Sequence, residues 1–151
     1  MKNFILSTLI LFSFQVFAQE VEIPKKAWKI IVHTSLNKSD NYKSVGQFLI
    51  DNNCTIDKNN VDFGTLSTGP VPVKKSSIVN YYNIVCKDSA IVFSGLMNAN
   101  MSFEMYGVKS ESSLEKIENK GMMGSLYKKS FNAMNELAIK IPNTKIEYVI
   151  E

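Results

Sequence analysis

Apolar and polar residues alternate along several short runs of the chain, and this pattern predicts a sheet. The first run, from Trp28 to Thr34, is rich in β-branched residues and predicts the first strand. Residues 55–68 predict a weaker extended segment with a turn or bulge at Asn59-Asn60, closed by a loop at 68–72. The run from Ile146 to Ile150 alternates again and predicts a strand near the end of the chain.

The clearest local pattern predicts a hairpin, in which residues 81–87 and 90–96 flank a two-residue turn at Asp88-Ser89. If Lys87 faces Ala90, the register collects one strongly apolar face. The pairs on that face are Cys86 with Ile91, Ile84 with Phe93, and Tyr82 with Gly95. Asn83 and Ser94 lie on the other face, and Gly95 leaves room for the ring of Tyr82, which is a packing role.

Two segments show helical spacing. Tyr42, Val45, Gly46 and Leu49 form one apolar stripe, which predicts a helix capped by Ser39 or Asp40. Residues 125–140 predict the strongest helix, which Pro142 ends.

Between the hairpin and the second helix the pattern is less regular. Residues 101–106 alternate and predict a further strand, while Ser112 with Glu115 resembles a capping box before the charged stretch 114–120.

The order of elements is β-α-β-β-β-(β)-α-β. It predicts an α+β domain with a mainly antiparallel sheet and two main helices packed on one face. In its first strand, its helix with Tyr42, Val45 and Leu49, its hairpin and its late helix, the chain resembles a family of small exported bacterial proteins of unknown function with a TBP-like fold. The resemblance covers most of the chain after residue 18 and implies no site residues. A fold shared with a DNA-binding protein does not by itself imply DNA binding.

The start of the chain predicts a cleaved signal peptide. Lys2 precedes an apolar run from Phe4 to Phe14, and Val16-Phe17-Ala18 forms a small-residue cleavage site. We therefore expect residues 1–18 to be removed, a single α+β domain at 19–151, and export to the periplasm or the outside of the cell. The apolar run is too short to span a bilayer, so we expect no stable membrane insertion after cleavage.

Charge argues against nucleic acid as a partner. All 17 basic residues are lysine, they are dispersed, and 14 acidic residues nearly balance them. A nucleic-acid-binding surface typically concentrates positive charge and uses forked guanidinium groups, which this chain lacks.

Common catalytic signatures are missing from the sequence, including nucleophile elbows, zinc-binding helices and phosphate-binding glycine loops. His33 is the single histidine, and strand parity places it with Lys29 on the open face of the sheet. We therefore assign no catalytic residue, cofactor or metal ligand, and we expect a protein that is not an enzyme.

Cys54 and Cys86 allow three interpretations. Export permits a disulfide, which would close a loop of about 33 residues and stabilise the fold by roughly 3 to 4 kcal/mol. The pair could instead be two buried small hydrophobic residues that never meet, or a reactive thiol pair.

Methionines crowd the segment that holds Met97, Met101, Met105, Met122 and Met123. Thioethers bind Cu(I), but methionine is also a common filler of irregular cores, which we favour here.

Three classes of function follow. The leading hypothesis is a non-catalytic envelope protein that contacts another envelope protein through the open sheet face, with Lys29, His33, Asn83 and Ser94, or through a sheet edge. The alternative is a binder of a small apolar ligand between helices and sheet, around Phe103, Met105, Tyr127 and Phe131. The third is an enzyme without a recognised signature, whose sign would be His33, a carboxylate and a lysine in one cleft.

Overall fold

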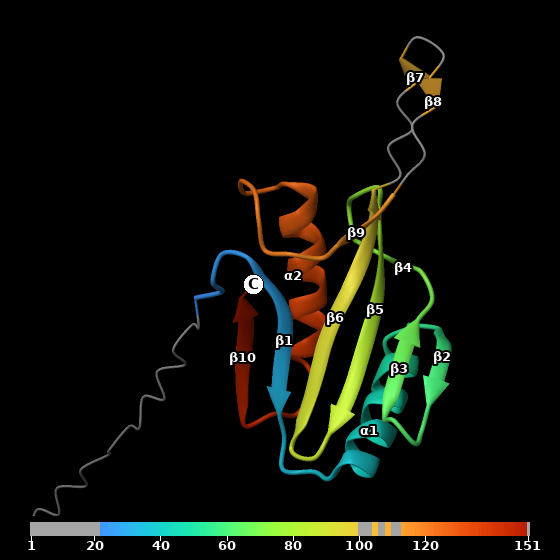
Figure 1. Ribbon diagram of the computed structural model, residues 1–151, viewed down its shortest axis with the longest axis vertical. Helices are drawn as coiled ribbons and strands as arrows, with labels where there is room; N and C mark the ends of the chain where they lie inside the picture. Colours follow the sequence, from blue (N-terminus) through green and yellow to red (C-terminus); the bar gives the residue numbers. More distant parts are fainter. Residues whose placement is uncertain (1–21, 100–103, 106–107, 110–112, 151) are drawn as a thin grey trace, which may run out of the picture.

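The computed structural model describes residues 22–99, 104–105, 108–109 and 113–150, which Figure 1 draws in colour. The predicted signal peptide lies outside these residues, so the division at residue 18 stays a prediction. The elements are β1 (Ala27–His33), α1 (Lys38–Asp51), β2 (Ile56–Asn60), β3 (Thr65–Thr68), β4 (Val71–Pro72), β5 (Ile78–Lys87), β6 (Ala90–Ala99), β7 (Glu104–Met105), β8 (Val108–Lys109), β9 (Leu114–Lys116), α2 (Leu126–Ala138) and β10 (Lys145–Ile150).

Eight strands form one sheet in the order β10-β1-β6-β5-β3-β2, with β4 paired to β5 and β9 paired to β6. All of these pairs are antiparallel, and β7 and β8 pair separately with each other. The predicted α+β class with a mainly antiparallel sheet is therefore confirmed. The finer expectation of a TBP-like topology stays a prediction.

The β5–β6 hairpin has the predicted register, since Lys87 faces Ala90 and Tyr82 faces Gly95. Ser89 in the turn adopts a left-handed conformation, with φ of 58°. A Cβ atom added to Gly95 would lie 2.6 Å from the carbonyl oxygen of Tyr81 and 3.3 Å from the ring of Tyr82. Glycine is required here because two strands and an aromatic ring meet at this point.

Both helices cover the same face of the sheet, and Figure 1 shows β1 and β6 passing in front of α2. The hydrophobic core lies between the two layers and takes residues from β1, β5, β6 and both helices. Its largest fully buried side chains include Tyr82, Phe93, Phe131, Ile30 and Leu49. No helix or strand covers the opposite face of this sheet within the described residues, and we call it the open face.

The first helix begins two or three residues earlier than predicted. Its N-cap is Asn37, whose side chain accepts a hydrogen bond from the backbone N–H of Asp40, so neither Ser39 nor Asp40 is the cap. Val45 and Leu49 are buried as predicted, but Asn41 shares their stripe. Its side chain bonds Thr34 Oγ1 at 2.9 Å and the carbonyl oxygen of Lys87 at 2.8 Å. These partners allow a polar residue to lie in the core.

The second helix was predicted over residues 125–140, and α2 spans Leu126–Ala138, with Ser125 as its N-cap and Pro142 a few residues beyond its end. Phe131 and Met134 are fully buried against the sheet. Ser130 is also fully buried, and it bonds to Asn80 of β5.

Four other local predictions were wrong or fall outside the described residues. The charged stretch 114–120 begins with strand β9, in which Lys116 pairs with Leu96 of β6. Ser112 of the expected capping box lies outside the described residues. The turn after β2 spans residues 61–64, beyond Asn59-Asn60, and the loop at 68–72 contains the short strand β4. Of the strand expected at 101–106, only Glu104–Met105 is described.

Candidate functional site

The four side chains predicted for the open face all belong to that face. Asn83 pairs directly with Ser94, and Lys29 and His33 occupy the alternating positions of β1 that point away from buried Ile30.

Only Asn83 and Ser94 of these four contact each other through a hydrogen bond. Ser94 Oγ donates to the backbone carbonyl of Asn83 at 3.4 Å, and Ser67 Oγ donates to the Asn83 side chain at 2.9 Å. His33 instead lies beside β10, where its Nε2 is 3.0 Å from Glu147 Oε2. The predicted set therefore forms a spread surface and not a compact site.

Lysines are the most frequent charged residues of the open face. Strand register places five of them there, namely Lys29, Lys58, Lys87, Lys116 and Lys145. The one carboxylate at a paired position of this face, among the described residues, is Glu147 opposite Ile31. At its paired positions the open face therefore carries more positive than negative charge.

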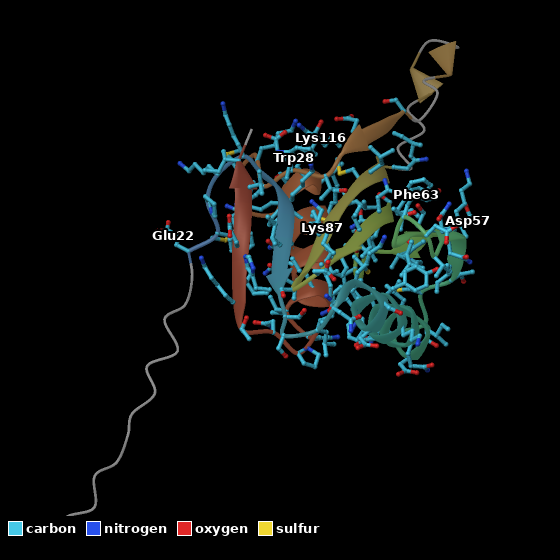
Figure 2. All side chains as sticks on the ribbon, turned by 60° about the horizontal axis from the view of Figure 1, so that its bottom comes forward. Glu22, Trp28, Asp57, Phe63, Lys87 and Lys116 are labelled. Atoms are coloured by element: carbon cyan, nitrogen blue, oxygen red, sulfur yellow. The ribbon has the colours of Figure 1, made fainter. Side chains whose placement is uncertain are left out.

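Trp28 gives this face an aromatic anchor. The bulge between Ala27 and Lys29 shifts the strand register, and the Lys29 ammonium lies 4.0 Å from the centre of the Trp28 ring. The Lys116 ammonium lies 4.8 Å from the same ring. Figure 2 shows Trp28 and Lys116 close together, with Lys87 farther along the sheet. Two cations beside one indole fix the ring by cation–π contacts.

An apolar row crosses the centre of the open face. Ile31 of β1 faces Val92 of β6, and Val92 faces Val85 of β5. All three are half-buried, although no helix covers them. A flat apolar row bordered by lysines can contact a protein surface but offers no enclosed site for a small substrate.

The disulfide between Cys54 and Cys86, the first of the three interpretations, is not formed, and both residues are free and buried. Cys86 lies beside Lys87, whose carbonyl binds Asn41 in the first turn of α1, whereas Cys54 follows the end of that helix. The Cys54 N–H donates to the carbonyl of Leu49, so Cys54 lies beside the last turn of α1. Leu49 is eight positions after Asn41, and this part of the helix rises about 12 Å. A disulfide requires Cα atoms within about 7 Å. The cysteines lie at opposite ends of α1, so the second interpretation, two buried residues that do not meet, describes the structure.

Neither thiol has the environment of a nucleophile. Burial raises the pKa of Cys86 to about 11. Burial also raises the pKa of Cys54, and nearby Lys140 opposes the rise. A reactive cysteine has a lowered pKa, so the third interpretation finds no support in these positions.

A cleft of about 740 Å³ lies on the helix side of the sheet, between the end of α1, the turn after β4 and one face of α2. Its floor includes Cys54 and Tyr82, which are 4% and 2% exposed. Its walls carry lysines from two directions, Lys74 and Lys75 from the turn, and Lys129 and Lys140 from α2 and the residues after it. Sequence reasoning missed this cleft because its residues come from three separate segments and have no common motif.

The cleft differs from the apolar pocket that the sequence suggested. Phe131 is fully buried in the core, and the Tyr127 hydroxyl bonds the carboxylate of Glu115. Phe103 and the side chain of Met105 lie outside what the structure describes. The pocket expected around these four residues therefore stays a prediction, and the cleft described above is a different site.

The methionines do not gather into a ligand set in the described part of the chain. Met97 is buried in the core, whereas Met122 and Met123 are 85% and 94% exposed in the loop before α2. Met101 lies outside the described residues. In residues 22–99, 104–105, 108–109 and 113–150, no three His, Cys, Asp or Glu side chains are grouped to hold a metal ion. No helix in these ranges has the length and apolarity to span a membrane.

Comparison with known proteins assigns this chain to no family. No family model matches the chain, and no curated protein matches it. The residues described above are therefore the basis for any functional assignment.

Proposed function

We propose that this chain is an exported, non-catalytic envelope protein that binds an acidic surface of another envelope protein through its open face. The observation that carries the proposal is the charge of that face, where five lysines stand against Glu147 at the paired positions. Complementary charge speeds association and selects partners with the opposite sign.

The anatomy of the face supports the same proposal. The row of Ile31, Val85 and Val92 supplies apolar contact area at its centre, and Trp28 is the type of residue that often dominates binding energy. Lys58, Lys87 and Lys145 are exposed, whereas Lys29 and Lys116 lie beside the Trp28 ring. An apolar centre with a charged rim is the usual composition of a protein interface.

The enzymatic hypothesis has less support. Its expected sign was His33, a carboxylate and a lysine in one cleft, but His33 and Glu147 lie on the open face. The cleft on the helix side contains lysines and carboxylates without a histidine.

The test is site-specific photo-crosslinking in the native envelope, with a benzophenone amino acid at Asn83 on the open face. The matched control carries the same group at Gln47, which is exposed on α1. We expect one dominant crosslinked partner from position 83 and none from position 47. Equal crosslinking from both positions would contradict a specific open face.

Charge reversal then tests the mechanism with the purified partner. Lys87→Glu with Lys145→Glu should weaken binding by about tenfold or more, and the loss should shrink at high salt. The control Lys43→Glu with Lys128→Glu makes the same change in net charge on the two helices and should leave affinity within about twofold. If both pairs weaken binding equally, general charge and not the open face controls association.

A further inference from the structure

The cleft on the helix side has no part in the proposed function, because it opens on the face opposite to the lysine-rich sheet. Its volume of about 740 Å³ lies within the range of pockets that hold small organic ligands.

The charge of the lining is positive, with four lysines against Asp51 and Glu136. None of the four lysines forms an ion pair with a carboxylate of the described residues. Asp51 is instead engaged by Gln47, whose Nε2 donates to its Oδ1 at 2.8 Å. Lysines that converge on a concavity without internal partners create a positive potential that favours an anion.

The turn that carries Lys74 and Lys75 is held in place by hydrogen bonds. The Val73 N–H donates to the Ile78 carbonyl at 3.0 Å, and Ser76 Oγ donates to the Val73 carbonyl at 2.9 Å. Lys75 adopts a left-handed conformation, with φ of 55°, which is uncommon for a residue with a side chain. The two ammonium groups thus extend from a backbone whose shape is already set.

The floor combines apolar surface with one buried hydroxyl. Val71, Val73, Ala133 and Leu137 supply the apolar part of the lining. The Tyr82 hydroxyl accepts a hydrogen bond from Asn80 Nδ2 at 3.1 Å, but its own proton meets no acceptor in the described part of the chain. Burial raises the pKa of Tyr82 to about 12, so this hydroxyl remains a donor at neutral pH.

We propose that the cleft binds a small organic anion, with its apolar body on the floor and its anionic group between the lysines of the turn and those of α2. Binding is non-covalent, because burial raises the pKa of the Cys54 thiol and the cleft presents no activated nucleophile. This site is independent of the open face, so either proposal can fail alone.

The test is an NMR titration of the purified protein with decanoate, followed through backbone amide shifts. Decylammonium is the matched probe with the same chain and the opposite charge, and inorganic phosphate tests anionic charge without an apolar body. We expect saturable shifts at Val73, Lys74 and Ala133, and affinity for decanoate at least about tenfold above that for either other probe.

Paired variants connect the binding to the lysines. Lys129→Gln with Lys140→Gln should weaken decanoate binding by about tenfold, since each ammonium contributes a modest attraction at a partly exposed site. Lys43→Gln with Lys128→Gln removes the same charge outside the cleft and should change affinity by less than about twofold. Amide spectra of the unliganded variants verify that both pairs fold.

Three results would overturn the proposal. They are the absence of saturable shifts at the cleft, equal binding of decylammonium, and equal loss of affinity in the two variant pairs. Equal affinity for inorganic phosphate would overturn the apolar part, because it would show that the lysines alone account for binding.

Discussion

Ser130 of α2 donates its side-chain hydroxyl to the amide oxygen of Asn80 on β5 over 2.5 Å, and both residues are fully buried. The same Asn80 side chain donates to the backbone carbonyl of Ser130 at 3.0 Å and to the Tyr82 hydroxyl at 3.1 Å. One asparagine thus joins helix to sheet and holds Tyr82 at the floor of the cleft. Buried polar groups of this kind specify one docking position, because any shift of α2 leaves them without partners.

Ser130→Ala should therefore destabilise the protein by about 1–3 kcal/mol, since the Asn80 oxygen loses its donor inside the core. Equilibrium unfolding in urea measures the change. The control is Ser67→Ala, which removes the Ser67 bond to Asn83 on the open face. Water replaces that partner, so the control should cost less than about 0.5 kcal/mol. Equal losses in the two variants would show that the buried bond contributes nothing beyond an exposed one.

Two glycines should respond to alanine with opposite signs. A Cβ atom at Gly95 would lie 2.6 Å from the Tyr81 carbonyl oxygen, so Gly95→Ala should cost about 1–3 kcal/mol through overpacking. Gly46 lies inside α1, and apart from its chain neighbours and the adjacent helix backbone no atom lies within 4 Å of an added Cβ. Gly46→Ala should stabilise by about 0.5–1 kcal/mol, because alanine has the higher helix propensity. Thermal unfolding of both variants measures the pair, and a stabilising Gly95→Ala would contradict the close packing.

The hairpin register was predictable because a two-residue turn and a single apolar face allow only one pairing, and Tyr82 opposite Gly95 follows from it. The existence of α2 was also predictable from its apolar spacing, although the helix ends at Ala138 and not at residue 140. Strand β9 was not, because Leu114–Lys116 has little strand character and pairs with β6 only in the folded protein. The edge of β6 that pairs with β9 is distant in sequence, so local residue patterns could not predict this strand.

The open face was predictable from the sequence, and the cleft was not. Lys29 and Asn83 could be assigned to the open face from strand parity alone, whereas the cleft depends on how α1 and the Lys74-Lys75 turn approach α2. The missing disulfide has a similar cause. Sequence placed Cys54 at a helix end and Cys86 in the core, but it could not tell which end of α1 lies beside which end of β5.

Both thiols should be free without any reductant, and both should react slowly with alkylating agents in the native protein. Cys54 and Cys86 are buried and free, so iodoacetamide in urea, without reductant, should alkylate both. The native protein at the same pH should show little alkylation over the same time. Intact-mass measurement counts the adducts, and a sample reduced beforehand is the control. If unreduced, unfolded protein took no adduct while the reduced control took two, a Cys54–Cys86 disulfide would be present in solution.

Cys86 should also make stability depend on pH in the alkaline range. Burial raises its pKa from an ordinary value of 9.0 to about 11, so between these values the folded protein retains a proton that the unfolded chain releases. Stability from this group is complete below pH 9 and decreases as pH rises toward 11, with a slope of at most about 1.4 kcal/mol per pH unit.

Urea unfolding of the wild type and of Cys86→Ala at several values from pH 8 to pH 11 isolates this contribution. The variant loses buried volume at every pH, but it has no thiol to titrate. We therefore expect the stability difference between the two proteins to be largest near pH 8 and to shrink steadily above pH 9. Cys54→Ala serves as the comparison, because Lys140 opposes the rise in the Cys54 pKa and the difference should shrink less. Curves for wild type and Cys86→Ala that stay parallel across this range would show that Cys86 titrates alike in the folded and unfolded chains.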